Sequence, residues 1–182
     1  MFRVSCRCCR ASLLAAATAF AALQAAASQY NGTTVTPENY TTVLSAAESG
    51  DVIYAEEGIY SNAMTSAAIV SVKAGVSFVA KHGYTNTFIK GDGTTVRRGA
   101  SLGSGALLRG FTICGTYYIT APSKGNGGGV SGASNAWVVD CVISNNVAYR
   151  GGAGTNANFF RCRFYNNTGT GGICTTMARV TA

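Results

Sequence analysis

Three features of the sequence predict an all-β protein folded as a right-handed parallel β-helix: a 21-residue internal repeat, apolar alternation within each copy, and abundant glycine with little charge. The 182 residues allow one domain. The chain has 23 glycines and 12% charged residues, whereas average soluble domains have about 7% glycine and about 25% charged residues. The low charge argues against a disordered chain and against a charge-rich helical bundle.

The repeat organises the second half of the chain. Residues 135–146 match residues 156–167 at a shift of 21, and a third copy begins at Gly171. A looser copy, residues 107–113, matches residues 137–143. A unit of this length is too short for a βαβ crossover, which needs about 30 residues. Strands that stack on their copies pair in parallel and in register, as in a solenoid.

Within each copy apolar residues alternate with polar ones, which is typical of a strand with one buried face. The shift of 21 then predicts three stacked pairs that point inward: Val139 with Phe160, Cys141 with Cys162, and Ile143 with Phe164. We expect this register to hold through the second half of the chain.

Asparagine pairs follow each copy of the strand and predict turns, because asparagine tolerates the left-handed backbone conformation. The shift places Asn145 beside Asn166 and Asn146 beside Asn167. Stacked amides of successive layers can hydrogen-bond along the axis. We expect the inward-facing pair to do so and to satisfy backbone groups of the turn.

Cys141 and Cys162 admit two interpretations. Adjacent strands lie about 4.8 Å apart, which is within the Cα range of a disulfide. Parallel side chains in register point the same way, which favours a stack of two buried thiols. A spacing of 21 residues is not a zinc-binding signature.

The N-terminal 27 residues predict a secretory signal peptide. Three arginines and no acidic residue precede an alanine-rich apolar run over residues 11–27, which ends in three alanines before Ser28. The alternative is a transmembrane anchor, for which this run is at the short limit. We therefore expect an exported protein, extracellular or at the outer membrane or cell surface, with no membrane span in the mature chain.

The mature chain is expected to begin with a cap and first coil over residues 28–60, followed by β-helix coils over residues 61–182. Thr36 and Pro37 predict the start of a helix over residues 37–49, which would cover the open end of the stack. The repeat stops inside a strand at Ala182, which predicts a β-helix truncated at its C-terminus. The N-terminal strands are expected at residues 51–55, 59–60, 68–72, 76–80 and 87–90.

Several short motifs resemble known families. Residues 50–60, Gly-Asp-Val-Ile-Tyr-Ala-Glu-Glu-Gly-Ile-Tyr, are similar to the opening of secreted bacterial proteins with the pectin-lyase-like β-helix, and residues 105–113 resemble a coil that often follows. Residues 164–167 and 171–173 resemble the F-x-x-N and G-G-x-I repeats of polymorphic outer-membrane proteins. The resemblance covers about residues 36–180 and implies a β-helical fold that hosts lyases, hydrolases or adhesins.

Residues suited to catalysis are scarce. A lyase of this type would need clustered carboxylates for Ca²⁺, and a hydrolase two carboxylates about 5–9 Å apart. Beyond residue 61 the acidic residues are Asp92 and Asp140. We expect Asp92 in a turn, Asp140 in a surface ion pair with Arg161 of the next coil, and the lone His82 in a loop. No catalytic, cofactor-binding or metal-binding residue is assigned, and no cofactor is expected.

The leading interpretation is a non-catalytic module for surface adhesion or glycan binding, with a polysaccharide or a host or cell-surface ligand as its partner. The alternative is a fragment of a polysaccharide lyase or glycoside hydrolase whose catalytic coils are missing. Nucleic acid is not expected as a partner, because Arg97-Arg98 is the only adjacent basic pair beyond the signal peptide. Outward-facing tyrosines suit contact with a sugar or a protein, but equally an ordinary strand surface: Tyr117, Tyr118, Tyr149 and Tyr165.

Overall fold

The structure, a computed structural model, describes residues 29–61, 67–120, 125–169, 174–175 and 180–181. In these residues the chain is predominantly β-structure with a single α-helix, and the pairings between its named strands are all parallel. The predicted all-β class is therefore confirmed. The predicted signal peptide, residues 1–27, lies outside the described residues.

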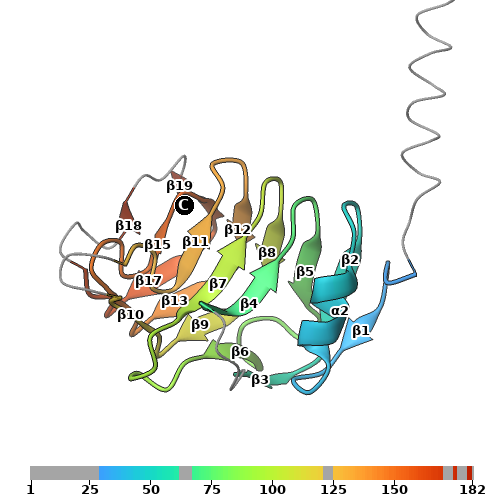
Figure 1. The fold of residues 1–182 in the computed structure, drawn as a ribbon, viewed down its shortest axis with the longest axis horizontal. Helices are drawn as coiled ribbons and strands as arrows, with labels where there is room; N and C mark the ends of the chain where they lie inside the picture. The colour runs from blue at the N-terminus through green and yellow to red at the C-terminus, as the bar shows by residue number, and fades with distance from the viewer. Residues whose placement is uncertain (1–28, 62–66, 121–124, 170–173, 176–179, 182) are drawn as a thin grey trace, which may run out of the picture.

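Most strands belong to three sheets, whose strands lie side by side along one axis (Figure 1). Sheet A consists of β1 (Thr34–Val35), β2 (Val52–Ala55), β5 (Ser77–Ala80), β8 (Leu107–Arg109), β12 (Trp137–Val139), β16 (Asn158–Phe160) and β19 (Val180–Thr181). Sheet B consists of β3 (Gly58–Tyr60), β6 (Thr87–Lys90), β9 (Thr112–Cys114), β13 (Val142–Ser144) and β17 (Arg163–Tyr165). Sheet C consists of β4 (Ala68–Val72), β7 (Arg98–Leu102), β11 (Val130–Gly132), β15 (Gly154–Thr155) and β18 (Cys174–Thr175). A two-stranded sheet joins β10 (Tyr117–Tyr118) to β14 (Val147–Ala148).

The chain passes repeatedly from sheet A to sheet B to sheet C and back to sheet A. In the second half, strands of sheets A and B pair at the predicted shift of 21, with Val139 opposite Phe160 and Ile143 opposite Phe164. Sheet C departs from it, because β11 pairs with β15 at a shift of 24 and β15 with β18 at a shift of 20. The looser copy also pairs as expected, because β8 lies against β12 and β9 against β13. The N-terminal strands agree with their predicted ranges to within one residue.

The predicted inward face of sheet A is wrong. Val138 and Phe159 are fully buried, whereas Val139 and Phe160 are half-buried on the outer face of their strands. The cause is the left-handed backbone of the next residue, since Asp140 has a φ of 53°. This turn interrupts the alternation of buried and exposed side chains. Val138 and Cys141, which are three positions apart rather than two, therefore both face the core. Beyond the turn the prediction holds, with Cys141 and Ile143 buried and Cys162 and Phe164 partly buried against the core.

The N-terminal helix is shorter than predicted. Helix α2 spans Tyr40–Ala46, and its N-cap residue is Asn39 rather than Thr36. The side chain of Asn39 instead accepts a hydrogen bond from the backbone N–H of Thr36 at 2.9 Å, which holds the preceding residues in a turn. Helix α2 packs against β4 at the N-terminal end of the stack (Figure 1), where Tyr40 Oη donates to the carbonyl of Ile69 at 3.0 Å.

The core lies between the three sheets. Within each sheet, the parallel register places the buried side chain of one strand next to the buried side chain of the adjacent strand. Sheet A contributes a fully buried row that runs through five adjacent strands: Ile53, Phe78, Leu108, Val138 and Phe159. Near the helix, four aromatic rings pack edge-on or tilted at 4.9–6.2 Å between centroids: Tyr40, Tyr60, Phe78 and Phe111. Burial of these rows is the main source of stability for such a fold.

Candidate functional site

The outer face of sheet A presents a second row of side chains above the buried one. The registers align five residues of adjacent strands: Tyr54, Val79, Arg109, Val139 and Phe160. Successive residues of a strand point to opposite faces, and the neighbours of these five form the buried row. Tyr54 is 36% exposed, and the exposed Trp137 lies on the same face near the other end of β12.

Asp140 follows this row at the turn from sheet A to sheet B and binds two arginines. Its carboxylate accepts hydrogen bonds from Arg161 Nε at 2.6 Å and Nη2 at 2.7 Å, and from Arg109 Nε at 3.0 Å. The predicted partner Arg161 is therefore confirmed. Arg109 was not predicted as a partner; β8 pairs with β12 at a shift of 30 residues, which places Arg109 opposite Val139 and beside Asp140.

The two arginines keep Asp140 ionised. The two hydrogen bonds from Arg161, and then the one from Arg109, hold the pKa of Asp140 below its usual value. An ionised carboxylate that is held by two guanidinium groups is a poor proton donor and a poor base. Its role is to fix the orientation of Arg109 and Arg161.

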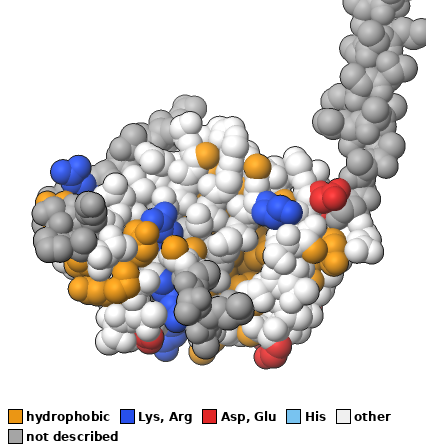
Figure 2. All heavy atoms as spheres, viewed as in Figure 1, with side chains coloured by type: hydrophobic (Ala, Val, Ile, Leu, Met, Phe, Trp, Pro, Cys, Tyr) orange, Lys and Arg blue, Asp and Glu red, His pale blue; other side chains and the backbone are white. Residues whose placement is uncertain are grey.

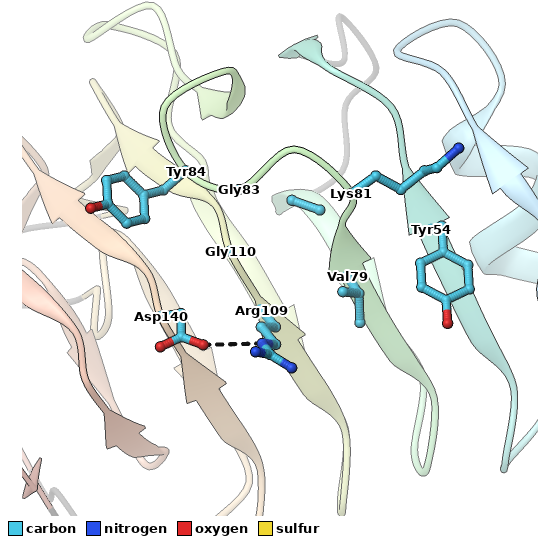
Figure 3. Close-up of a pocket in the computed structure, with 9 residues that line it drawn as sticks. Tyr54, Val79, Lys81, Gly83, Tyr84, Arg109, Gly110 and Asp140 are labelled. Atoms are coloured by element: carbon cyan, nitrogen blue, oxygen red, sulfur yellow. Dashed lines mark hydrogen bonds and ion pairs between the residues drawn. The ribbon is translucent and has the colours of Figure 1, made fainter.

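A groove of about 610 Å³ lies beside this pair (Figure 3). Tyr54 from β2 and Tyr84 from the loop after β5 lie at its two sides, with Arg109 and Asp140 between them. Lys81 also lines the groove, but its ammonium group points away (Figure 3) and pairs with Glu56 at 2.5 Å. The groove is open to solvent and is lined by two phenol rings, one oriented guanidinium group and one carboxylate.

Glu56 is another carboxylate at the turns between sheets A and B. Its pKa is lowered, mainly by the hydrogen bond from Lys81, and His82 Nε2 lies 3.2 Å from its other oxygen. His82 is exposed in a loop, as predicted, but the fold gives it an acidic neighbour that the sequence does not show. Glu56 does not line the groove, where Asp140 is the acidic side chain.

The remaining candidates have structural roles. Asp92 lies in a turn, as predicted, and its carboxylate accepts backbone hydrogen bonds from Thr94 at 2.9 Å and Thr95 at 2.7 Å. Cys141 and Cys162 are free thiols, which agrees with the thiol interpretation rather than a disulfide. Within the described residues, histidine, cysteine and acidic side chains form no group of three that could hold a metal ion.

Tyr54, Tyr84, Trp137 and Arg109 were missed by the sequence reasoning. They come from separate copies and loops. The predicted inward position of Val139 would also have placed Trp137, two residues earlier, on the inner face. Of the tyrosines that were singled out, Tyr165 is 49% exposed and the other three are half-buried.

No helix in the described part of the chain has the length and apolar character needed to cross a membrane. Comparison of the chain with protein-family models, with curated proteins and with solved structures gave no match.

Proposed function

We propose that this chain is an exported, right-handed parallel β-helix module that binds a glycan in the groove on sheet A without cleaving it. The β-helix is supported by the repeated passage through sheets A, B and C with parallel registers. The right-handed sense follows from the strong preference of parallel crossovers for that hand. The kinship with pectin-lyase-like and polymorphic outer-membrane proteins rests on the motif resemblance and belongs to this proposal.

The observation that carries the binding proposal is the orientation of Arg109 by Asp140 between two tyrosines. Asp140 accepts a hydrogen bond from Nε of Arg109, and the terminal amino groups of Arg109 have no ion pair in the described part of the chain. They are fixed donors for sugar hydroxyl groups. Tyr54 and Tyr84 add flat apolar faces with polar tips. An open groove suits an extended polymer better than a small molecule, which proteins usually enclose.

The experiment is a glycan array probed with residues 28–182, followed by titration calorimetry on the glycans that bind. Replacing Tyr54 or Tyr84 by alanine should weaken binding at least about tenfold, which is about 1.4 kcal/mol. Tyr165→Ala is the matched control, since Tyr165 is an exposed tyrosine of β17 outside the groove. Equal losses for all three variants would contradict the assignment to the groove.

The absence of cleavage is tested separately. The groove has one carboxylate, and that carboxylate is already bound by two arginines. Incubation with polygalacturonate and Ca²⁺ should therefore yield neither unsaturated sugars nor new reducing ends. Either product would favour the alternative, a fragment of a polysaccharide lyase or hydrolase.

Export predicts that the mature protein begins at Ser28. Mass spectrometry of the secreted protein should show this N-terminus. Recovery of an intact N-terminus in a membrane fraction would instead favour an anchor.

A further inference from the structure

Beyond the groove on sheet A, a second surface lies where the chain passes from sheet B to sheet C. We name it the arginine–tyrosine corner and define it by seven residues: Lys90, Arg97, Arg98, Tyr117, Tyr118, Tyr149 and Arg150. They come from the end of β6, the start of β7, β10, and the segment after β14. The sequence separates them by up to 60 positions.

The pairing of β10 with β14 brings these residues together. Tyr117 lies opposite Val147 and Tyr118 opposite Ala148, directly before Tyr149 and Arg150. The backbone N–H of Arg97 donates to the carbonyl of Tyr117 at 2.8 Å. Lys90 and Arg97 line one shallow groove of about 500 Å³. Figure 2 shows hydrophobic side chains gathered over this end of the molecule, with Lys and Arg side chains beside them.

Arginines and tyrosines of the corner stack on one another. The guanidinium carbon of Arg98 lies 4.2 Å from the ring centroid of Tyr118, and that of Arg150 lies 5.7 Å from the centroid of Tyr149. Nε of Arg98 is buried and has no hydrogen-bond partner in the described part of the chain. Stacking on a ring holds a guanidinium group in place while its edge can still bond an anion; the buried Nε of Arg98 is not one of the donors that an anion could reach.

The corner differs in charge from the turns between sheets A and B. There, Lys81 is paired with Glu56, and Arg109 and Arg161 are paired with Asp140. All seven acidic residues of the chain belong to the described part. Within that part, no ion pair joins an acidic residue to the four cations of the corner: Lys90, Arg97, Arg98 and Arg150.

Asp92 is an acidic residue beside the corner, since it lines the shallow groove with Lys90 and Arg97. Its carboxylate is already used by Thr94 and Thr95 within its own turn. Beyond it in the sequence, Asp140 is the one remaining acidic residue of the chain. Because Thr94 and Thr95 are neutral donors, Asp92 keeps its charge, and the corner has an excess of positive charge, with four cations against one carboxylate.

We propose that the arginine–tyrosine corner binds an anionic polysaccharide through its sulfate or carboxylate groups. Guanidinium groups match both kinds of oxyanion with paired hydrogen bonds. The cations and rings extend over three successive passages of the chain, which suits a polymer with repeated charges rather than one small anion. The neighbouring tyrosines provide flat surface for the sugar rings between the charges.

Three dextrans of equal length test this proposal: unmodified dextran, carboxymethyl dextran and dextran sulfate. The two charged polymers should bind residues 28–182 with an affinity that falls as NaCl rises, and their relative affinities show which anionic group is preferred. The variant R97Q/R98Q/R150Q should lose at least about tenfold in affinity for the preferred polymer, as expected for the loss of charge-assisted hydrogen bonds.

Because Arg98 is half-buried, R97Q/R150Q provides a second variant that keeps its stacking and should show an intermediate loss. The charge-matched control for R97Q/R150Q is K73Q/R163Q, which removes two positive charges outside the corner and outside the Asp140 cluster and should change the affinity by less than about threefold. Equal losses in R97Q/R150Q and its control would overturn the proposal. So would duplex DNA that binds the corner more tightly than both charged dextrans. Y54A should leave binding of the charged dextrans intact, which separates this surface from the groove on sheet A.

Discussion

The side-chain amide of Asn146 donates a hydrogen bond to Oδ1 of Asn167 in the next layer, at 3.0 Å between Nδ2 and Oδ1. The same Oδ1 accepts from the backbone N–H of Asn146 at 3.1 Å. In the other direction, Oδ1 of Asn146 accepts from the hydroxyl of Thr116 at 2.8 Å. Three layers are thus joined along the axis of the stack. Asn145 and Asn166, with φ of 55° and 53°, make the turn itself and are exposed.

Replacing Asn146 by leucine should destabilise the protein by about 3 kcal/mol, because the backbone N–H of Thr116 and the carbonyl of Ile113 lose their partner, at about 1–3 kcal/mol for each unpaired group. Asn146 is fully buried and donates to that carbonyl at 3.0 Å. Urea unfolding followed by circular dichroism measures the difference. Thr168→Leu, at an exposed position after the same turn, should change stability by less than about 0.5 kcal/mol. A cost for Thr168→Leu equal to that of Asn146→Leu would contradict the buried ladder.

The two ion pairs that Asp140 forms with Arg109 and Arg161 should make the stability of the protein depend on pH. The pKa of Asp140 is lower in the folded protein than its usual value of 3.8, so its contribution is present above about pH 5 and is lost as the pH falls through the folded pKa. The contribution should be about 1 kcal/mol or less, since both arginines are about half exposed. We expect the difference in unfolding free energy between the wild type and Asp140→Asn to be constant from about pH 8 to about pH 5 and to shrink below about pH 4. Asparagine tolerates the left-handed backbone, so a difference that grows in acid would refute the assignment.

Gly99 should not accept a side chain. A Cβ there would lie 2.5 Å from Cγ2 of Ile113 and 2.6 Å from the carbonyl oxygen of Gly129. Gly99→Ala should therefore cost about 2–3 kcal/mol through overpacking, measured as a lower midpoint of urea unfolding. Ser101→Ala, two residues along the same strand and half-buried, should cost less than about 0.5 kcal/mol. Equal unfolding midpoints for the two variants would contradict the close packing of Gly99 against Ile113 and Gly129.

Cys141 should be the least reactive of the described thiols. It is 1% exposed, and burial raises its pKa well above the usual value of 9.0. After treatment of the native protein with iodoacetamide at about pH 8, peptide mapping should find Cys141 unmodified. The same reagent in urea should label it fully. Labelling of native Cys141 as fast as that of half-buried Cys114 would show that this part of the core is open.

The amino-acid sequence was sufficient to establish the repeat and the strand register that it implies in sheets A and B, but not the register of sheet C. The shift of 21 residues predicts which residues of β12 and β16 lie opposite one another, because parallel pairing in register needs only two copies of equal length. The inward asparagine ladder was predicted from the same shift. The range of β6, residues 87–90, could be read from its local pattern alone.

Tertiary packing was needed to establish which side of sheet A faces the core and where the charged side chains meet. Alternation predicts a face only while the backbone stays extended, and the left-handed turn at Asp140 reverses the phase that Val138 and Val139 would otherwise follow. The number of residues between successive layers sets which charged side chains meet. It determines that Arg109 pairs with Asp140 and that Arg98 and Arg150 lie at one corner. The number of residues between layers varies along the chain. Contacts between side chains of different layers are therefore determined by how whole layers pack, rather than by local sequence.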